Sequence, residues 1–242
     1  MKPDYISVQV GDIVTFGSYW QSSSKHKDPI NWQILDVNDG EALVISTRIL
    51  DCRPYNDEGV SGHWGSCSLR NWLNYDFLDE VIPEKYNSPI LHSVLLTDLP
   101  TEEDSTGSKC LFRIRRQVET FDYFFLLSYS EIGYVSSIDP KLKCVPTPYA
   151  LNQGVCQGNF GSSPWWLRDL HDYGYEAYYV PEINEPILLV HDSRTISYVD
   201  TAITVVGVRP AVRISLLSKY WQPVQGYAGS VIGYTSKPEK LD

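Results

Sequence analysis

The amino-acid sequence predicts an α+β fold, built mostly of short antiparallel strands with two or three helices. Apolar and polar residues alternate over 30–35, which is the period of a half-buried strand, and Asn-Asp-Gly at 38–40 is a strong hairpin turn. Over 68–78 the apolar residues instead recur at helical spacing. With 242 residues, 43% of them hydrophobic, the chain is long enough to build one sizeable core.

The N-terminal part, residues 1–65, is predicted to be a β meander. β-prone runs at 8–10 and 13–16 flank a Gly-Asp turn, and 42–46 supplies the strand that returns from the hairpin. A polar loop at 22–28 precedes the strand that leads into the hairpin.

The middle part, residues 66–150, is predicted to be helical and mixed. One helix covers 68–78, with Ser66 or Ser68 as its cap and Trp72 on its buried face. Further predicted elements are a short helix at 83–86, strands at 89–96 and 121–127, and an exposed polar loop at 99–108. Another helix is predicted to start at Ser128, because Glu131 follows three residues later, which is the spacing of a capping box.

Residues 151–215 are rich in Gly, Pro, Asn and Ser, which predicts short strands separated by long loops. Trp165 and Trp166 are expected in a packed strand, and further strands at 187–190 and 207–212. Residues 216–242 form a C-terminal extension. Because nothing separates two cores, we assign 1–242 to a single domain.

The formal charge of −10, from 30 acidic and 20 basic side chains, argues against two classes of partner. An acidic surface repels phosphate backbones and anionic lipid heads, so we expect neither nucleic acid nor membrane as a partner. No run approaches the roughly 20 apolar residues that span a bilayer, and the N-terminus lacks the apolar stretch of a secretory signal.

The five cysteines are odd in number, and no two of them have the spacing of a zinc knuckle or a redox dithiol. We therefore expect reduced, mostly buried thiols and a cytoplasmic protein. The alternative is one disulfide or one functional thiol.

Several blocks, taken together and in order, resemble a bacterial family of unknown function that is common in gut Firmicutes. The blocks are 17–19 with Gln21, 29–35, 51–56, 68–74, 125–128, 146–150, 165–168 and 207–211. They extend over most of the chain. The sequence departs from the family at Trp20, where the family has Pro, and at Asp169-Leu170, where it has Ser-Pro.

The blocks Trp-Trp-Leu-Arg at 165–168 and Gly-Val-Arg-Pro-Ala at 207–211 are also similar to the end of C-type-lectin-like domains. That group includes formylglycine-generating-enzyme-like folds and the variable ligand-binding proteins diversified by retroelements. The resemblance implies a lectin-like C-terminal half whose binding surface lies between the two blocks. The Arg-Gly-Gly-Ser-Trp type block of the enzymes is missing, so we do not expect their oxidase activity.

No catalytic signature is present: the chain lacks a Gly-x-Ser-x-Gly elbow, a phosphate-binding glycine loop and a His-Glu-x-x-His pair. An enzyme of unrecognised type would use Cys144 and Cys156, or His171 and His191. We expect no metal or cofactor. The alternative is calcium, whose oxygen ligands would come from Glu182, Asn184, Glu185, Asp192 and Asp200, although these follow no fixed loop spacing.

Tyrosines crowd the segment between Trp165 and Gly207. Tyrosine supplies rigid, amphipathic contact area at low entropic cost, which is why binding surfaces favour it. The candidate ligand-binding residues are His171, Tyr173, Tyr175, Tyr178, Tyr179, His191 and Tyr198. A structural role is expected for Trp72, Trp165, Trp166, Arg168 and Arg209. We therefore expect a non-catalytic protein that binds a protein, peptide or glycan through aromatic loops; the alternatives are the enzyme above and a structural subunit of a larger assembly.

Overall fold

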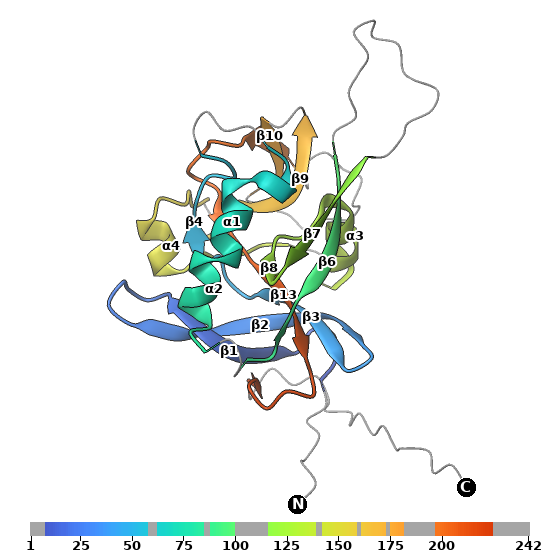
Figure 1. The fold of residues 1–242 in the computed structure, drawn as a ribbon. Coiled ribbons are helices and arrows are strands. Elements are labelled where there is room, and N and C mark those ends of the chain that lie inside the picture. Colours follow the sequence, from blue (N-terminus) through green and yellow to red (C-terminus); the bar gives the residue numbers. More distant parts are fainter. Residues whose placement is uncertain are drawn as a thin grey trace, which may run out of the picture.

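The computed structural model describes residues 8–57, 62–84, 88–99, 116–138, 142–158, 161–172, 175–181 and 197–224. Within these ranges most residues in regular structure belong to strands, and nearly all strand pairs are antiparallel. The prediction of a strand-rich fold with few helices is confirmed. In Figure 1 the larger sheet lies at the bottom and the smaller sheet at the top, with α1 and α2 running between them.

The larger sheet begins with a meander of β1 (Ile13–Trp20), β2 (Lys27–Asn38) and β3 (Glu41–Ser46). The hairpin between β2 and β3 turns at Asp39 and Gly40, whose φ angles of 47° and 79° are those of a tight type I′ connection. This confirms the turn predicted at 38–40. The run at 8–10 is not a strand; it enters the turn at Gly11.

β13 (Ala211–Ser215) completes the centre of this sheet. It pairs with β3 on one side, and with β5 (Ile90–Leu91) and β8 (Phe124–Phe125) on the other. β14 (Gln222–Pro223) pairs with β1 at the edge. The sheet therefore joins segments from both ends of the chain.

The smaller sheet has the strand order β11-β10-β9-β12-β4. Its strands are β4 (Asp51–Cys52), β9 (Trp165–Asp172), β10 (Glu176–Val180), β11 (Ser197–Asp200) and β12 (Gly207–Val208). The tyrosine-rich segment was expected to be a loop, and this was wrong for 175–181, most of which is strand β10. Strands keep these side chains in fixed directions, which loops do not.

The helix predicted over 68–78 is two helices, α1 (Ser68–Asn74) and α2 (Asp76–Val81), preceded by the 3₁₀ turn η1 (Trp64–Ser66). They are separated at Tyr75, whose φ and ψ of −120° and −77° are not helical. The cap of α1 is neither Ser66 nor Ser68. The thiol of Cys67 accepts the N–H of Arg70 at 3.3 Å.

α3 (Tyr129–Ile138) begins with the predicted capping box. The Ser128 N–H donates to Glu131 Oε2 at 2.7 Å, and the Glu131 N–H donates to Ser128 Oγ at 3.1 Å. α4 (Pro148–Asn152) is not among the predicted helices; Thr147 caps it and Pro148 occupies its first turn. The described residues thus contain four α-helices rather than two or three.

β6 (Ser93–Asp98) and β7 (Gln117–Asp122) form a two-stranded ribbon, at the right of Figure 1. The strand expected over 89–96 is divided between β5 and β6. The second half of the strand expected over 121–127 is continuously buried, whereas its first half is not: Phe121 is 54% exposed and Phe124 has no exposed surface.

Some predicted elements fall outside the described residues: all but Leu99 of the loop at 99–108, the strand at 187–190, and the extension beyond Val224. Pro83 and Glu84 are not helical, and the rest of the short helix expected at 83–86 also lies outside. No helix within the described ranges is long and apolar enough to cross a membrane.

Four tryptophans with no exposed surface lie in one hydrophobic cluster of the described residues: Trp32, Trp64, Trp165 and Trp166. Each indole N–H is satisfied, because it donates to Phe16 O, Asp122, Leu142 O or Arg53 O respectively. The side chains of β9 therefore help to join the smaller sheet to the rest of the core.

Candidate functional site

Four rings from three strands and one helix form a surface that we call the aromatic face: Tyr129, His171, Tyr178 and Tyr198. Tyr178 and Tyr198 lie directly opposite each other on β10 and β11. The His171 ring stacks on Tyr198, with centroids 3.5 Å apart and planes 4° from parallel. Tyr178 stands edge-on to both rings, and Tyr129 from α3 lies 4.9 Å from it.

The aromatic face is open to solvent. Tyr198 is 47% exposed and Tyr129 is 42% exposed, while His171 and Tyr178 are half-buried. Burial and the neighbouring Tyr129 raise the pKa of Tyr178, so its hydroxyl keeps its proton at neutral pH. Ring surfaces with hydroxyl groups that can donate or accept are suited to binding amphipathic ligands.

A buried polar cluster supports this face. Arg168, 4% exposed, donates to both carboxylate oxygens of Glu131 at 2.5 and 3.1 Å, and to the carbonyl of Leu126. Burial opposes ionisation of Glu131, but the Arg168 guanidinium outweighs it and lowers the pKa of that carboxyl. Next to it, burial raises the pKa of Asp169 to about 6. Asp169 accepts the backbone N–H of Tyr129 at 2.5 Å, which links β9 to the first turn of α3.

The structure brings together three of the predicted ligand-binding residues, His171, Tyr178 and Tyr198. Tyr175 is 63% exposed and lies just before β10. Tyr179 instead points to the opposite side of β10, where its ring meets the buried Trp166 at 6.4 Å.

Tyr173 and His191 lie outside the described residues, as do four of the five calcium candidates: Glu182, Asn184, Glu185 and Asp192. Asp200, the fifth, is exposed on β11. Within the described ranges no group of three or more His, Cys, Asp or Glu side chains is arranged to hold a metal ion.

Tyr129 was missed by the sequence reasoning. It is 49 residues from Tyr178 in sequence, and only the docking of α3 against β9 brings the two rings together. The single sequence signal was the capping box, which places Tyr129 in the first turn of a helix.

The residues expected to be structural are buried. Trp165 and Trp166 have no exposed surface, and Arg209 lies 4.9 Å above the Trp165 ring while its Nε donates to Ser46 O. Trp72 is 8% exposed and packs against Phe77.

The cysteines differ in their surroundings. Cys144 is 1% exposed, with its thiol 3.7 Å from Thr47 O, whereas Cys156 is exposed. Burial raises the pKa of Cys52 and of Cys67 to about 12 in each case, so both remain protonated thiols at neutral pH.

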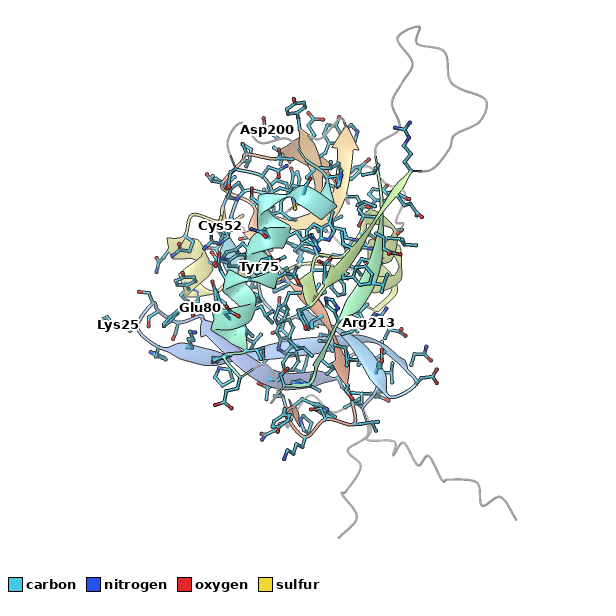
Figure 2. The ribbon with its side chains drawn as sticks, viewed as in Figure 1. Lys25, Cys52, Tyr75, Glu80, Asp200 and Arg213 are labelled. Carbon is cyan, nitrogen blue, oxygen red and sulfur yellow. The ribbon has the colours of Figure 1, made fainter. Side chains whose placement is uncertain are left out.

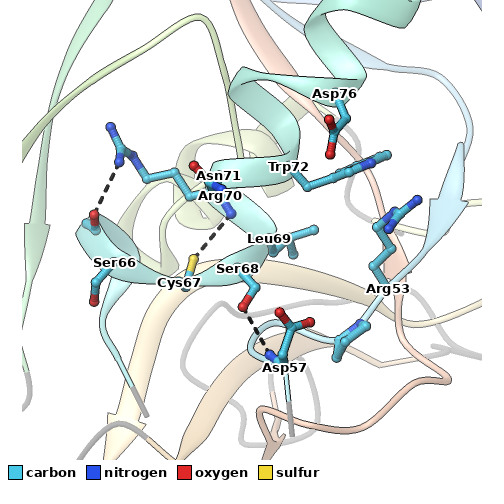
Figure 3. Close-up of a pocket in the computed structure, with 12 residues that line it drawn as sticks. Arg53, Asp57, Ser66, Cys67, Ser68, Leu69, Arg70, Asn71, Trp72 and Asp76 are labelled. Atoms are coloured by element: carbon cyan, nitrogen blue, oxygen red, sulfur yellow. Dashed lines mark hydrogen bonds between the residues drawn. The ribbon is translucent and has the colours of Figure 1, made fainter. Parts of the chain in front are cut away.

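A polar pocket of about 410 Å³ lies beside α1 (Figure 3). Its main feature is Arg53, whose guanidinium lies 4.2 Å above the Trp72 ring and whose Nε is 3.7 Å from the buried Asp51 carboxylate. In Figure 3, Asp76 and Asp57 lie at opposite ends of the labelled group, with Trp72 and Arg53 between them. The sequence reasoning did not identify this pocket, because its walls come from separate segments.

A family model described as "Domain of unknown function (DUF6273)" matches residues 39–216. The chain belongs to this family. The matched part of the DUF6273 domain includes the smaller sheet, the polar pocket and the aromatic face. No curated protein and no solved structure matches the chain significantly.

Proposed function

We propose that this DUF6273 protein is a non-catalytic binding protein that recognises a protein, peptide or glycan ligand through the aromatic face. The observation that supports this most is the His171–Tyr198 stack, because two parallel rings are kept on the surface rather than in the core. Exposed aromatic clusters on soluble domains commonly mark interaction sites.

The rigidity of the aromatic face adds to this support. Three of its rings stand on paired strands, and the backbone that carries the fourth is fixed by the hydrogen bond from the Tyr129 N–H to the Asp169 carboxylate. A surface that is already ordered loses little conformational entropy when it binds, so more of the contact energy remains as affinity.

The resemblance to C-type-lectin-like domains supports a finer version of this proposal. In it the C-terminal half is lectin-like, the protein is bacterial, and it is related to variable proteins diversified by retroelements. We also propose that it acts in the cytoplasm without a cofactor, and that it binds neither nucleic acid nor membrane, given its net charge of −10.

An unbiased selection tests the binding proposal. The protein would be screened against a random peptide display library and a glycan array, and each selected ligand would be measured again with Tyr198→Ala. A ring that acts as a hot spot contributes about 2 kcal/mol, so binding is expected to weaken by about 30-fold. The stability of the variant should change by about 1 kcal/mol or less, because Tyr198 is half exposed.

The matched control is Tyr75→Ala. Tyr75 is a 66% exposed tyrosine at the α1–α2 junction, labelled in Figure 2, and it does not belong to the aromatic face. It should leave binding unchanged. Ligands that bind Tyr198→Ala as tightly as the wild type would overturn the proposal, as would a Tyr198→Ala variant that loses its fold.

A further inference from the structure

Two acidic residues on neighbouring strands, which we call the acidic row, lie at one end of the aromatic face. Glu176 on β10 lies opposite Asp200 on β11. Like charges directly opposite each other on neighbouring strands repel and destabilise the pair. Two carboxylates in one register are therefore unfavourable unless a cation neutralises them.

Within the described residues, few cationic groups lie near these carboxylates. Glu176 Oε2 lies 3.2 Å from His171 Nδ1, and within the described residues the Asp200 carboxylate accepts one hydrogen bond, from the backbone N–H of Ala202. No lysine or arginine among the described residues forms an ion pair with Glu176 or Asp200. Both side chains are open to solvent.

The acidic row and the aromatic face share one side of the sheet. Glu176 and Tyr178 are two residues apart on β10, as are Tyr198 and Asp200 on β11, and side chains two apart in a strand point the same way. The separation along each strand is about 7 Å. One long side chain can therefore reach a carboxylate with its head group while its stem lies on a tyrosine ring.

We propose that the ligand of the aromatic face is cationic: a protein or peptide segment that presents lysine or arginine. Its ammonium or guanidinium group pairs with Glu176 and Asp200, and it lies against the rings of Tyr178 and Tyr198, where the negative ring face attracts a cation. The net charge of −10 attracts the same ligand from a distance. This inference rests on the proposed function and names the chemistry of its ligand.

Three synthetic peptides of equal length test the charge requirement: an oligolysine, the same peptide with every lysine acetylated, and an oligoglutamate. Binding would be measured by titration calorimetry, with the interaction mapped by NMR. The oligolysine is expected to bind and to shift the signals of Glu176, Tyr198 and Asp200. The other two peptides should bind at least about tenfold more weakly.

Two charge-matched double variants separate local from global attraction. Glu176→Gln with Asp200→Asn removes two charges at the face, and should weaken oligolysine binding by about tenfold. Asp57→Asn with Asp76→Asn removes two charges beside the polar pocket, from carboxylates without a hydrogen bond or ion pair in the described part of the chain. That control should change binding by less than about twofold.

An equal loss of oligolysine affinity in both double variants would overturn the inference, because the net charge of the molecule alone would then explain the binding. Failure of the wild type to bind oligolysine would also overturn it. Selected ligands that need Tyr198 but tolerate Glu176→Gln with Asp200→Asn would overturn the cationic ligand alone and leave the binding proposal standing. Selected ligands that do not need Tyr198 would overturn both the cationic ligand and the binding proposal.

Discussion

Asp169 is a carboxyl group in a place where ionisation is costly. Burial raises its pKa from an ordinary value of 3.8 to about 6, although the Arg168 guanidinium and the Tyr129 N–H favour the charged form. Between these two pH values the folded protein holds a proton that the unfolded chain has released. The free energy of unfolding therefore falls as the pH rises from about 4 to about 6.

Asp169→Asn is expected to remove this pH dependence. The amide oxygen can still accept the Tyr129 N–H, but it carries no charge, so the variant should be more stable than the wild type at pH 7 by about 2–3 kcal/mol. At pH 4 the two proteins should differ little. Urea unfolding at both pH values measures the free energy of unfolding of each protein. Burial also raises the pKa of Asp51, but both proteins contain Asp51, so its contribution cancels in the difference between them. If the free energies of unfolding of the two proteins changed in parallel between pH 4 and pH 7, the proposed role of Asp169 would be contradicted.

At the scale of elements, α1 depends on one buried ring. Trp72 packs against Phe77, 5.1 Å away between ring centroids, and carries the Arg53 guanidinium on its face. Trp72→Ala should lower the free energy of unfolding by about 3–5 kcal/mol, because it leaves a cavity and removes the surface beneath Arg53. Tyr75→Ala, three residues on and exposed, should cost no more than about 0.5 kcal/mol. Chemical denaturation tests both, and a loss under about 1 kcal/mol for Trp72→Ala would show that the core face is misassigned.

Elements whose signals are local could be predicted from the sequence. The hairpin at Asp39 and Gly40 and the capping box at Ser128 and Glu131 each depend on residues within four positions of one another. The division of the predicted helix at Tyr75 was not predictable in this way, because the apolar spacing continues through it from Trp72 to Phe77.

The candidate site shows the same limit. A tyrosine-rich segment was visible in the sequence, but the side to which each ring points was not, because that depends on the register of β9, β10 and β11. Register places Tyr178 on the aromatic face and turns Tyr179 towards Trp166. Register also creates the acidic row, whose two members, Glu176 and Asp200, come from separate strands.

For the molecule as a whole, the state of the cysteines distinguishes between cellular compartments. Cys52 and Cys67 are buried and form no disulfide, and Cys110 lies outside the described residues. Titration with a thiol reagent in denaturant, without added reductant, should count five thiols per chain. A fully reduced sample serves as the control for complete reaction. A count of three would mean a disulfide, and would contradict the proposed cytoplasmic location.

The position of β13 has a consequence for synthesis on the ribosome. Its residue Ala211 pairs with Ile45 of β3, so the N-terminal meander receives its neighbour only when most of the chain has been made. At about 5–20 residues per second, β3 waits on the order of ten seconds or more with unpaired backbone groups along one edge. Such an edge is a template for pairing with another nascent chain. Newly made protein is therefore most prone to aggregate before residue 211 emerges, and a message cut short ahead of β13 would yield chains that cannot close the larger sheet.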